Sequence, residues 1–360
     1  MRAVLESGAE VALTAFGVTE HGNFADPHRP DAGRRSVLWQ PYQAMHGEAG
    51  TGELARDLGL SPTEVSERLE QARQALLAAR STRPQPGTDH KILTSWNGLT
   101  LAALADAARI LDDAHWLERA RELAGFLRAT MRGPQGRMLH SFQGVARVSG
   151  LLEDHVHTAL GLVALFQARG DLADLLWARE LWDIIRQDFW DEEAGQFWAT
   201  GGDAETLVAR QAHAFDSAIL SDNAAGAQLA LWMHRYFADE AALGVAQRTI
   251  STFAAEMQAT PHGLGGLWWA QAFASAPLQE LAVLGTPTER RSLEREAAQH
   301  FLPFVALSPV TAGTALPAAA ERPGGAAYVC VNHACRLPAA SPEALREQLA
   351  LAGLLPQTLS

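Results

Sequence analysis

Apolar residues recur with the period of an α-helix along most of the chain beyond residue 50. The first clear case begins at Ser61 and Pro62, where Glu64 completes a capping box, and it continues to about Arg80 with one apolar face. Three further stretches follow the same plan of helix, tight turn and second helix, with a period of roughly 60 to 70 residues. The pattern therefore predicts a mainly α-helical chain built from repeated hairpins.

The predicted helical pairs occupy residues 95–130, 152–189 and 217–257. Each pair ends in a turn that contains a glycine. After two of these turns, the segments 137–148 and 196–210 alternate apolar and polar residues, which predicts β-hairpins that join one pair to the next. Repeated helical hairpins of this kind form either an open solenoid or a closed α/α toroid.

The chain divides by pattern into three parts. Residues 1–50 are rich in Gly, Pro and His, show no sustained period and are predicted to be irregular. Residues 51–276 carry the helical hairpins of the toroid. Residues 277–360 contain short apolar runs bounded by Gly or Pro, together with two helical stretches, and this pattern predicts a small C-terminal α/β tail.

The charge balance argues against several classes of function. Lys and Arg number 29 against 41 Asp and Glu, which gives the 360-residue chain a net charge of −12. An acidic chain without a basic block is a poor match for nucleic acid, and no apolar run reaches the roughly 18 residues of a membrane span. The N-terminus lacks the pattern of a signal peptide, and two cysteines do not make a disulfide framework. We expect a cytoplasmic protein with neither nucleic-acid nor membrane partners.

Rare residues mark positions to examine. All but one of the 29 basic residues are arginine, the exception being Lys91, and asparagine occurs only four times. Such a composition is typical of a G+C-rich genome, in which lysine drifts easily to arginine. A lysine that remains is a candidate for a place where arginine cannot substitute for its point charge.

Polar clusters stand at the start of the first helix of each predicted pair. Their candidate residues are Asp89, Lys91, Trp96 and Asn97 in the first cluster, Glu153, Asp154 and His155 in the second, and Asp216, Ser221 and Asn223 in the third. If the first helices line the centre of a toroid, the three clusters meet at one end of its cavity. Free N–H groups of helix N-termini at that end attract the oxygen atoms of a ligand.

The chemistry of these residues suits a polyhydroxylated ligand such as a sugar. Carboxylates accept hydrogen bonds from hydroxyl groups, and Asp89, Glu153, Asp154 and Asp216 are the candidate acid–base catalysts. The other candidates would bind substrate, with Trp96 stacking on a sugar ring. The alternative is that each cluster only caps its helix and that the chain is a non-catalytic helical scaffold.

The histidines and cysteines leave alternatives open. His155 and His157 are two residues apart and point to different faces of a helix, which argues against a helical zinc site. Cys330 and Cys335 frame the segment C-V-N-H-A-C. Free cysteines packed in a small sheet are the favoured interpretation, ahead of a reversible disulfide and of a metal site. We therefore expect neither a metal nor an organic cofactor.

Five ordered motifs resemble one known family. They are F-G-V-T-E-H-G-N-F at residues 16–24, D-x-K-I-L-T-S-W-N-G-L from Asp89, L-E-D from Leu152, D-x-A-x-x-S-x-N from Asp216 and Y-V-C-x-N-x-x-C from Tyr328. Together they are similar to the thioredoxin-domain-containing proteins related to spermatogenesis-associated protein 20 and bacterial YyaL. The resemblance covers essentially the whole chain. It implies a six-hairpin glycosidase-like (α/α)6 toroid, similar to that of the sugar 2-epimerases.

Members of that family carry a thioredoxin-like domain and the first toroid helices ahead of the matched segment. The resemblance therefore implies that this chain is a C-terminal part with an incomplete toroid, or the remnant half of a redox-linked scaffold. About eight helices are predicted here, whereas a closed ring of six hairpins has twelve, and the open faces would suit a protein partner. The family motifs are also altered, with His90 inside D-x-K and with Ala212 and His213 in place of a lysine and an acid.

Overall fold

The computed structural model describes residues 1–5, 8–40, 48–202 and 209–355, which fall into two compact units, Met1–Asp89 and His90–Ser360. The first unit contains helices α1 (Arg2–Leu5), α2 (Ala9–Ala15), α3 (Glu48–Leu58) and α4 (Pro62–Ser81) and the strand pair β1 (Phe24–Ala25) and β2 (Arg34–Arg35). Helix α4 begins with the predicted capping box between Ser61 and Glu64.

The boundary of the first unit differs from the predicted one. Residues 1–50 were expected to be irregular and residues 51–89 to belong to the toroid, whereas α2, α3 and α4 share a core of their own. Val11 of α2, Leu54 of α3 and Val65 of α4 are buried together in that core. The apolar face of α4 is therefore satisfied inside the first unit, which is why a helical period alone placed it in the wrong domain.

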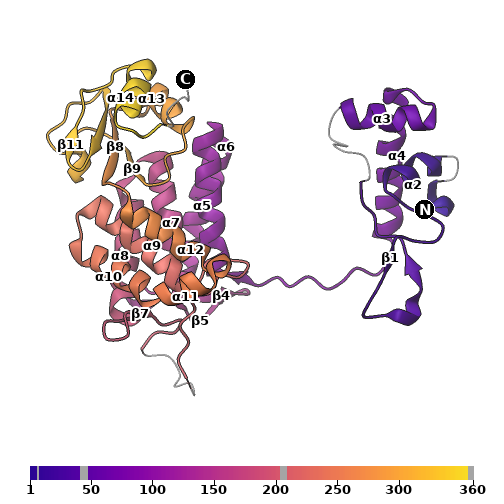
Figure 1. Cartoon of the computed structure of the whole chain (residues 1–360), viewed down its shortest axis with the longest axis horizontal. Coiled ribbons are helices and arrows are strands. Elements are labelled where there is room, and N and C mark those ends of the chain that lie inside the picture. Colours follow the sequence, from indigo (N-terminus) through magenta and orange to yellow (C-terminus); the bar gives the residue numbers. More distant parts are fainter. Residues whose placement is uncertain (6–7, 41–47, 203–208, 356–360) are drawn as a thin grey trace. The chain divides into compact units, whose positions relative to one another are not determined.

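The second unit contains helical hairpins whose helices lie side by side (Figure 1). Three hairpins are formed by α5 (Thr94–Leu111) with α6 (Ala114–Phe126), α7 (Leu152–Arg169) with α8 (Leu172–Asp188), and α9 (Asp222–Phe237) with α10 (Glu240–Thr252). After the short helix α11 (Ala254–Ala259), α12 (Gly265–Ser275) packs on α9 and on α10.

The first helices of the hairpins form an inner row. Helix α7 packs between α5 and α9, and α9 in turn contacts α12, while α6, α8 and α10 pack behind their own partners. This is the layout of part of an α/α toroid, and it confirms the predicted mainly α-helical class. Between Thr94 and Ser275, the described residues of this unit hold seven helices of more than ten residues, against the twelve of a closed ring of six hairpins.

The inner helices α5 and α7 approach so closely that only glycine fits at their crossing. A Cβ atom on Gly98 of α5 would lie 2.5 Å from the carbonyl carbon of His157, and one on Gly161 of α7 would lie 2.6 Å from the carbonyl oxygen of Gly98. The glycine of the W-N-G motif is therefore a packing residue, because it brings the starts of α5 and α7 together.

Short β-hairpins lie at the end of the unit where the inner helices begin (Figure 1). The predicted hairpin at 137–148 is confirmed as β4 (Leu139–Phe142) and β5 (Ala146–Ser149), to which β3 (Ile92–Leu93) adds a third strand. The second hairpin begins earlier than predicted, because β6 (Trp190–Asp191) pairs with β7 (Gln196–Phe197). Residues 203–208 of the predicted segment lie outside the described residues.

The C-terminal tail is an α/β layer at the opposite end of the helices (Figure 1). Its sheet has the order β11-β10-β8-β9, in which β8 (Gln279–Leu284) and β9 (Val305–Val310) are parallel and joined through α13 (Pro287–Ala298). The strands β10 (Ala326–Val331) and β11 (Ala334–Cys335) are antiparallel and precede α14 (Pro342–Leu351). The predicted α/β tail is thus confirmed.

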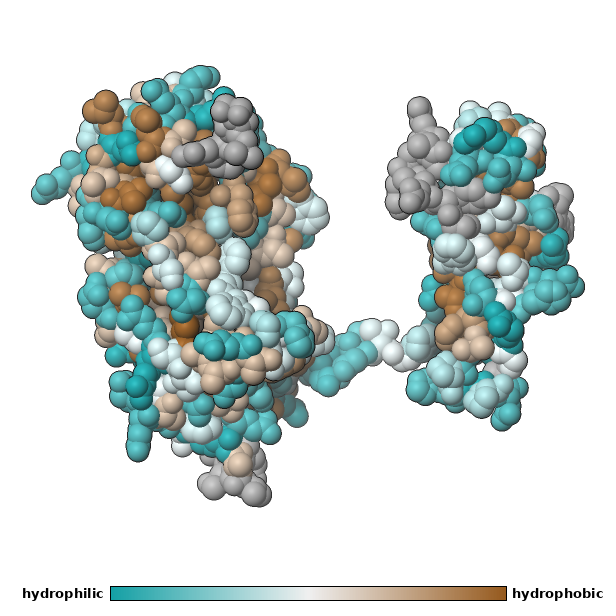
Figure 2. Space-filling model, viewed as in Figure 1, coloured by the Kyte–Doolittle hydropathy of each residue, from teal (hydrophilic) through white to brown (hydrophobic). Residues whose placement is uncertain are grey.

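Alternate residues of the tail strands pack into two different cores, that of the tail and that of the helical hairpins. Leu281 and Val283 of β8 pack with α13 and α14, whereas Ala282 and Leu284 join the core of the helical hairpins. This period of two explains why the strands read as continuous apolar runs, since both faces of the sheet are covered. The viewed surface differs from these buried strands, because apolar residues are interspersed there with polar ones (Figure 2).

Two further expectations can be compared with the structure. Free cysteines were favoured, but Cys330 and Cys335 are joined by a disulfide across the turn between β10 and β11. Among the described residues, each helix is too short or too polar to cross a membrane.

Candidate functional site

The carboxylate of Asp154 joins the starts of two inner helices. Asp154 is fully buried near the start of α7, and one of its oxygens accepts a hydrogen bond from the backbone N–H of Ser95 in α5, at 3.0 Å. Its other oxygen accepts from the backbone N–H of Leu151, at 2.8 Å, and lies 2.9 Å from Nδ1 of His140 on β4. Asp154 therefore caps two helices whose preceding residues, Leu93 and Leu151, have no polar side chain.

Asp216 performs the same task one repeat later. Its carboxylate accepts hydrogen bonds from the backbone N–H groups of Ser221, at 2.9 Å, and of Gly266 in α12, at 2.7 Å. Ser221 is the N-cap of α9, and the amide of Asn223 bonds to the backbone of Phe197 on β7. These three predicted site residues hold the loops and helix ends in place.

Glu153 is the carboxylate of this region that remains available for chemistry. It is half-buried beside Asp154, and the nearest polar contact of its Oε1 is the hydroxyl of Ser95, which donates at 3.3 Å. Burial raises the pKa of Glu153, and the negative charges of Asp154 and Asp222 raise it further. A carboxyl group in this setting can hold and release a proton closer to neutral pH than an exposed glutamate.

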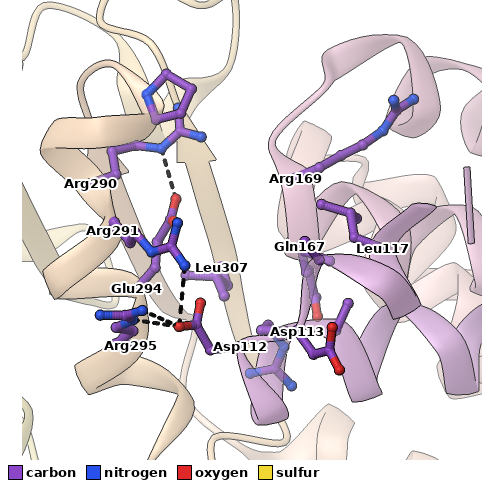
Figure 3. A pocket seen from close by; sticks show the side chains of 15 residues that line it. Asp112, Asp113, Leu117, Gln167, Arg169, Arg290, Arg291, Glu294, Arg295 and Leu307 are labelled. Carbon is purple, nitrogen blue, oxygen red and sulfur yellow. Dashed lines mark hydrogen bonds and ion pairs between the residues drawn. The ribbon is translucent and has the colours of Figure 1, made fainter.

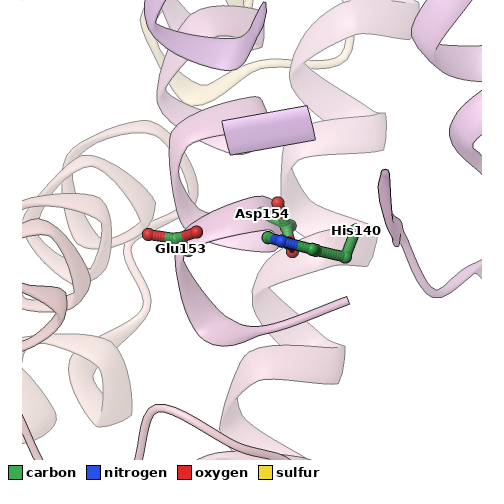
Figure 4. Close-up of side chains that lie close together, drawn as sticks. All are labelled: His140, Glu153 and Asp154. Atoms are coloured by element: carbon green, nitrogen blue, oxygen red, sulfur yellow. Dashed lines mark hydrogen bonds and ion pairs between the residues drawn. The ribbon is translucent and has the colours of Figure 1, made fainter. Parts of the chain in front are cut away.

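Two histidines outside the predicted set bind the buried aspartates of this region. The hydrogen bond to Asp154 raises the pKa of His140 (Figure 4). His213 bonds through Nδ1 to the buried Asp222 of α9 at 2.8 Å. We call His140, Glu153, Asp154, His213 and Asp222 the mouth cluster. The sequence signal for it is the repetition of an acid in the first turn of α7 and of α9, each with a histidine 9 to 14 residues upstream.

A groove of about 460 Å³ runs along the inner row of helices. Its polar and aromatic lining includes Asp106, His157, Gln167, Gln228, Trp232 and Trp269. His157 stands one helical turn after Glu153 and therefore on the same face of α7, whereas the residues of the mouth cluster are not among those that line the groove. Trp96, the predicted stacking residue, is 61% exposed and lies outside this lining, whereas Trp232 and Trp269 belong to it.

His157 is the least satisfied side chain of the groove. It is 1% exposed, and neither ring nitrogen has a hydrogen-bond partner within the described part of the chain. Burial lowers its pKa to about 4, so the imidazole is neutral at physiological pH. A buried ring with one free donor and one free acceptor is suited to a hydroxyl group of a ligand.

Three other predicted site residues, Asp89, Lys91 and Asn97, are not part of the mouth cluster. Asp89 is exposed and ends the first unit, whereas the mouth cluster belongs to the second. Lys91 is exposed, and its charge lowers the pKa of His140. Asn97 donates to the carbonyl of Leu93 at 2.8 Å within the first turn of α5.

His155 is a buried structural residue. Its Nδ1 donates to the carbonyl of Leu151, and its Nε2 accepts from the backbone N–H of Met138 at 3.0 Å. Burial lowers its pKa. The ring thereby ties α7 to the start of the β4–β5 hairpin and is fully occupied in doing so.

The spacing of His140, Glu153 and Asp154 also fits a cation. One ligand atom from each lies within 4.8 Å of the others, a separation that a divalent ion could bridge. Both oxygens of Asp154 already accept backbone hydrogen bonds, however, and an ion would compete with these. The hydrogen-bonded arrangement of Asp154 therefore weighs against metal binding.

A second cavity, of about 350 Å³, lies at the C-terminal ends of α5 and α7 (Figure 3). Its arginines are paired with carboxylates: Arg291 and Arg295 contact Asp112, and Arg290 contacts Glu294. The C-terminal end of a helix favours cations. These arginines are thus explained by the docking of α13 on the helices.

The chain is similar in sequence to known proteins. It is 25% identical to human spermatogenesis-associated protein 20 over 96% of its own length and 46% of that protein. The rat protein of the same name is 27% identical over 64% of this chain and 30% of its own length. The chain therefore spans less than half the length of these relatives, and no family model matches it.

Similar solved structures include enzymes that act on sugars. A GH76 α-mannanase from Bacteroides thetaiotaomicron has a TM-score of 0.41 at 16% identity, over 71% of this chain and 70% of that one. Cellobiose 2-epimerase from Bacillus thermoamylovorans has a TM-score of 0.40 at 14% identity, over 47% of this chain and 46% of that one. The sequence comparisons agree with the resemblance drawn from the motifs: this chain is similar to spermatogenesis-associated protein 20.

Proposed function

We propose that the inner groove binds a sugar and that the mouth cluster transfers protons to and from it. The observation that carries the proposal is the position of Glu153, a half-buried carboxyl group with a raised pKa, one helical turn before His157, which lines a groove of polar and aromatic side chains. Trp232 and Trp269 offer apolar faces for a sugar ring, and His157, Gln167 and Gln228 offer partners for its hydroxyl groups.

The roles follow from the contacts of each group. Glu153 is the proposed base, because its carboxylate makes only a long hydrogen bond to Ser95. His140 is the proposed acid, because the bond to Asp154 raises the pKa of its imidazole and so favours the protonated form. Asp154 and Asp222 are positioning residues that orient His140 and His213.

This arrangement supports proton transfer at a sugar carbon better than glycoside hydrolysis. Hydrolysis by two carboxyl groups needs a second carboxylate that can attack or activate water. Asp154 and Asp216 instead accept backbone hydrogen bonds through both of their oxygens, and Asp222 is bound to the imidazole of His213. We therefore keep the predicted catalytic role for Glu153 and propose an isomerisation or epimerisation of a reducing sugar.

The test uses the full chain, a panel of aldohexoses and disaccharides, and two readouts. Isothermal titration measures binding, and NMR in D2O follows the exchange of sugar C–H protons. We expect Glu153→Gln to keep binding and lose exchange, while Trp232→Ala loses binding. Glu256→Gln, on the exposed surface of α11, is the matched control and should retain both.

Two results would overturn the proposal. The first is a panel in which no sugar binds and Trp232→Ala behaves as the wild type, which would favour the non-catalytic scaffold. The second is exchange that disappears on addition of EDTA and returns with a divalent metal, which would assign His140, Glu153 and Asp154 to a metal site instead.

A further inference from the structure

The disulfide of the tail lies in a row of three reactive side chains. In the sheet, Glu280 of β8 is the direct partner of Cys330 on β10, and Cys330 is the direct partner of Cys335 on β11. Directly opposed residues of antiparallel strands present their side chains on the same face, with Cβ atoms roughly 5 Å apart. A carboxyl group, a buried sulfur and an exposed sulfur therefore stand side by side.

A tight turn fixes this register. The loop between β10 and β11 consists of Asn332 and His333, whose φ angles are 50° and 64°. Two positive φ angles in a two-residue loop are typical of a type I′ turn, which aligns the flanking residues as opposed pairs. The side chain of Asn332 accepts from the backbone N–H of Leu278 at 3.0 Å and fastens the turn to the start of β8.

The two sulfurs differ in accessibility and in charge environment. Cys330 is fully buried, whereas Cys335 is exposed. The guanidinium of Arg322 donates to the sulfur of Cys335 at 3.0 Å, and it is held there by the carbonyl of Ala318 and by the ring of Tyr328. A fixed positive charge beside a sulfur stabilises its thiolate form.

Glu280 brings an acid–base group to the buried sulfur. Its side chain is 7% exposed and lines a cavity of about 340 Å³ together with Arg322 and His333. Burial raises the pKa of Glu280, while the charges of Arg322, His333 and Arg235 lower it. His234 and Glu240 are the other charged or titratable groups of that cavity. This position suits a group that takes a proton from the thiol of Cys330.

We propose that Cys330 and Cys335 are a redox-active pair that reduces an accessible disulfide. In the reduced chain the Cys335 thiolate attacks one sulfur of the substrate disulfide, which forms a mixed disulfide and releases one thiolate. Cys330 then passes its proton to Glu280 and attacks the sulfur of Cys335, which closes the internal disulfide and releases the second thiolate. A dithiol reductant returns the pair to the reduced state, so that two electrons and two protons move in each cycle.

The test uses the full chain, reduced with dithiothreitol and freed of it, with the aromatic disulfide DTNB as substrate. Absorbance counts the released aromatic thiolate, and intact mass shows whether an adduct remains. The wild type is expected to release two thiolates per chain and retain no adduct. Cys330→Ser should release one and retain one adduct, and Cys335→Ser should lose the fast phase.

The roles of Arg322 and Glu280 have separate readouts. Arg322→Met should raise the pH midpoint of the fast phase by about one unit, and Arg322→Lys should restore most of that shift. Arg336→Met is the matched control, because Arg336 follows Cys335 but contacts the carbonyl of Leu351. Glu280→Gln should slow the second release at least tenfold and leave the first unchanged.

Retention of two adducts by the wild type would overturn the proposal, because it would show that the cysteines react independently. An unchanged pH midpoint in Arg322→Met would remove the assigned role of Arg322, provided that circular dichroism shows a folded variant. Sugar binding in the groove is measured separately, so either proposal can fail without the other.

Discussion

Substitution of Gly98 by alanine tests the packing that builds the candidate site. In an ordinary helix interior, this change stabilises a protein by about 0.5 to 1 kcal/mol because glycine costs conformational entropy. At Gly98 the new Cβ would lie 2.5 Å from the carbonyl carbon of His157 and 2.6 Å from the backbone nitrogen of Thr158. Both atoms belong to the backbone of α7, so a side-chain rotation cannot relieve the contact.

The expected cost follows from this distance. Carbon atoms in contact are separated by about 3.5 Å or more, so α5 and α7 must move apart by about 1 Å. Overpacking of a dense core by one methyl group costs about 1 to 3 kcal/mol, and this exceeds the gain in helix propensity. We therefore expect Gly98→Ala to lower the free energy of unfolding by about 1 to 2 kcal/mol.

Urea unfolding followed by tryptophan fluorescence measures this effect. All the tryptophans except Trp39 lie in the second unit, so the signal reports on the helices concerned. Gly244→Ala in α10 is the matched control, because its Cβ would meet no atom within 4 Å, and it should stabilise. The reasoning is refuted if Gly98→Ala is as stable as Gly244→Ala.

Three further substitutions probe titratable side chains of the same region. Asp154→Ala leaves the backbone N–H groups of Ser95, which is buried, and of Leu151, which is partly buried, without this acceptor, and it should cost about 3 to 5 kcal/mol in urea unfolding. The folded state raises the pKa of Glu153, so the free energy of unfolding falls as pH rises above 4.5, the ordinary pKa of glutamate. Glu153→Gln should therefore have a higher melting temperature than the wild type at pH 7 but not at pH 4. The folded state lowers the pKa of His157 from 6.5 to about 4, so stability falls as pH drops through this interval, and His157→Leu should reduce that loss between pH 7 and pH 4.5.

Each of these has a contrary outcome. Asp183→Ala, on the exposed face of α8, should be nearly neutral, and an equal loss from both aspartates would contradict the capping role of Asp154. A melting-temperature difference between Glu153→Gln and the wild type that does not change with pH would show that Glu153 is not desolvated. An unchanged acid sensitivity in His157→Leu would place the responsible titration elsewhere.

Much of the architecture was readable from the sequence because it depends on local pattern. The helical pairs, the hairpin at 137–148 and the α/β tail were predicted from periodicity and turn residues, and the structure confirms them. The domain boundary was not, because α4 has the same helical period whether it packs in a toroid or against α2 and α3. Periodicity indicates that one face of a helix is buried, but it does not indicate which element packs against that face.

The candidate site residues remain a prediction, and the structure gives some of them other tasks. Asp154 joins the starts of α5 and α7, Asp216 joins those of α9 and α12, and His140 and Asp222 were not selected. A carboxylate that caps its own helix and one that faces a ligand have the same sequence signal. The distinction depends on backbone N–H groups supplied by neighbouring repeats, which no local pattern reveals.

The sequence by itself determined the helical repeat, the tail and the positions where polar residues begin each inner helix, since these follow from short-range periods and capping preferences. Tertiary structure alone decided which of those residues cap helices and which glycine allows α5 and α7 to touch. It also decided which strand pairings align Glu280, Cys330 and Cys335. These outcomes depend on contacts between segments far apart in the chain. Their energies are set by distances of a few ångströms that the order of residues does not specify.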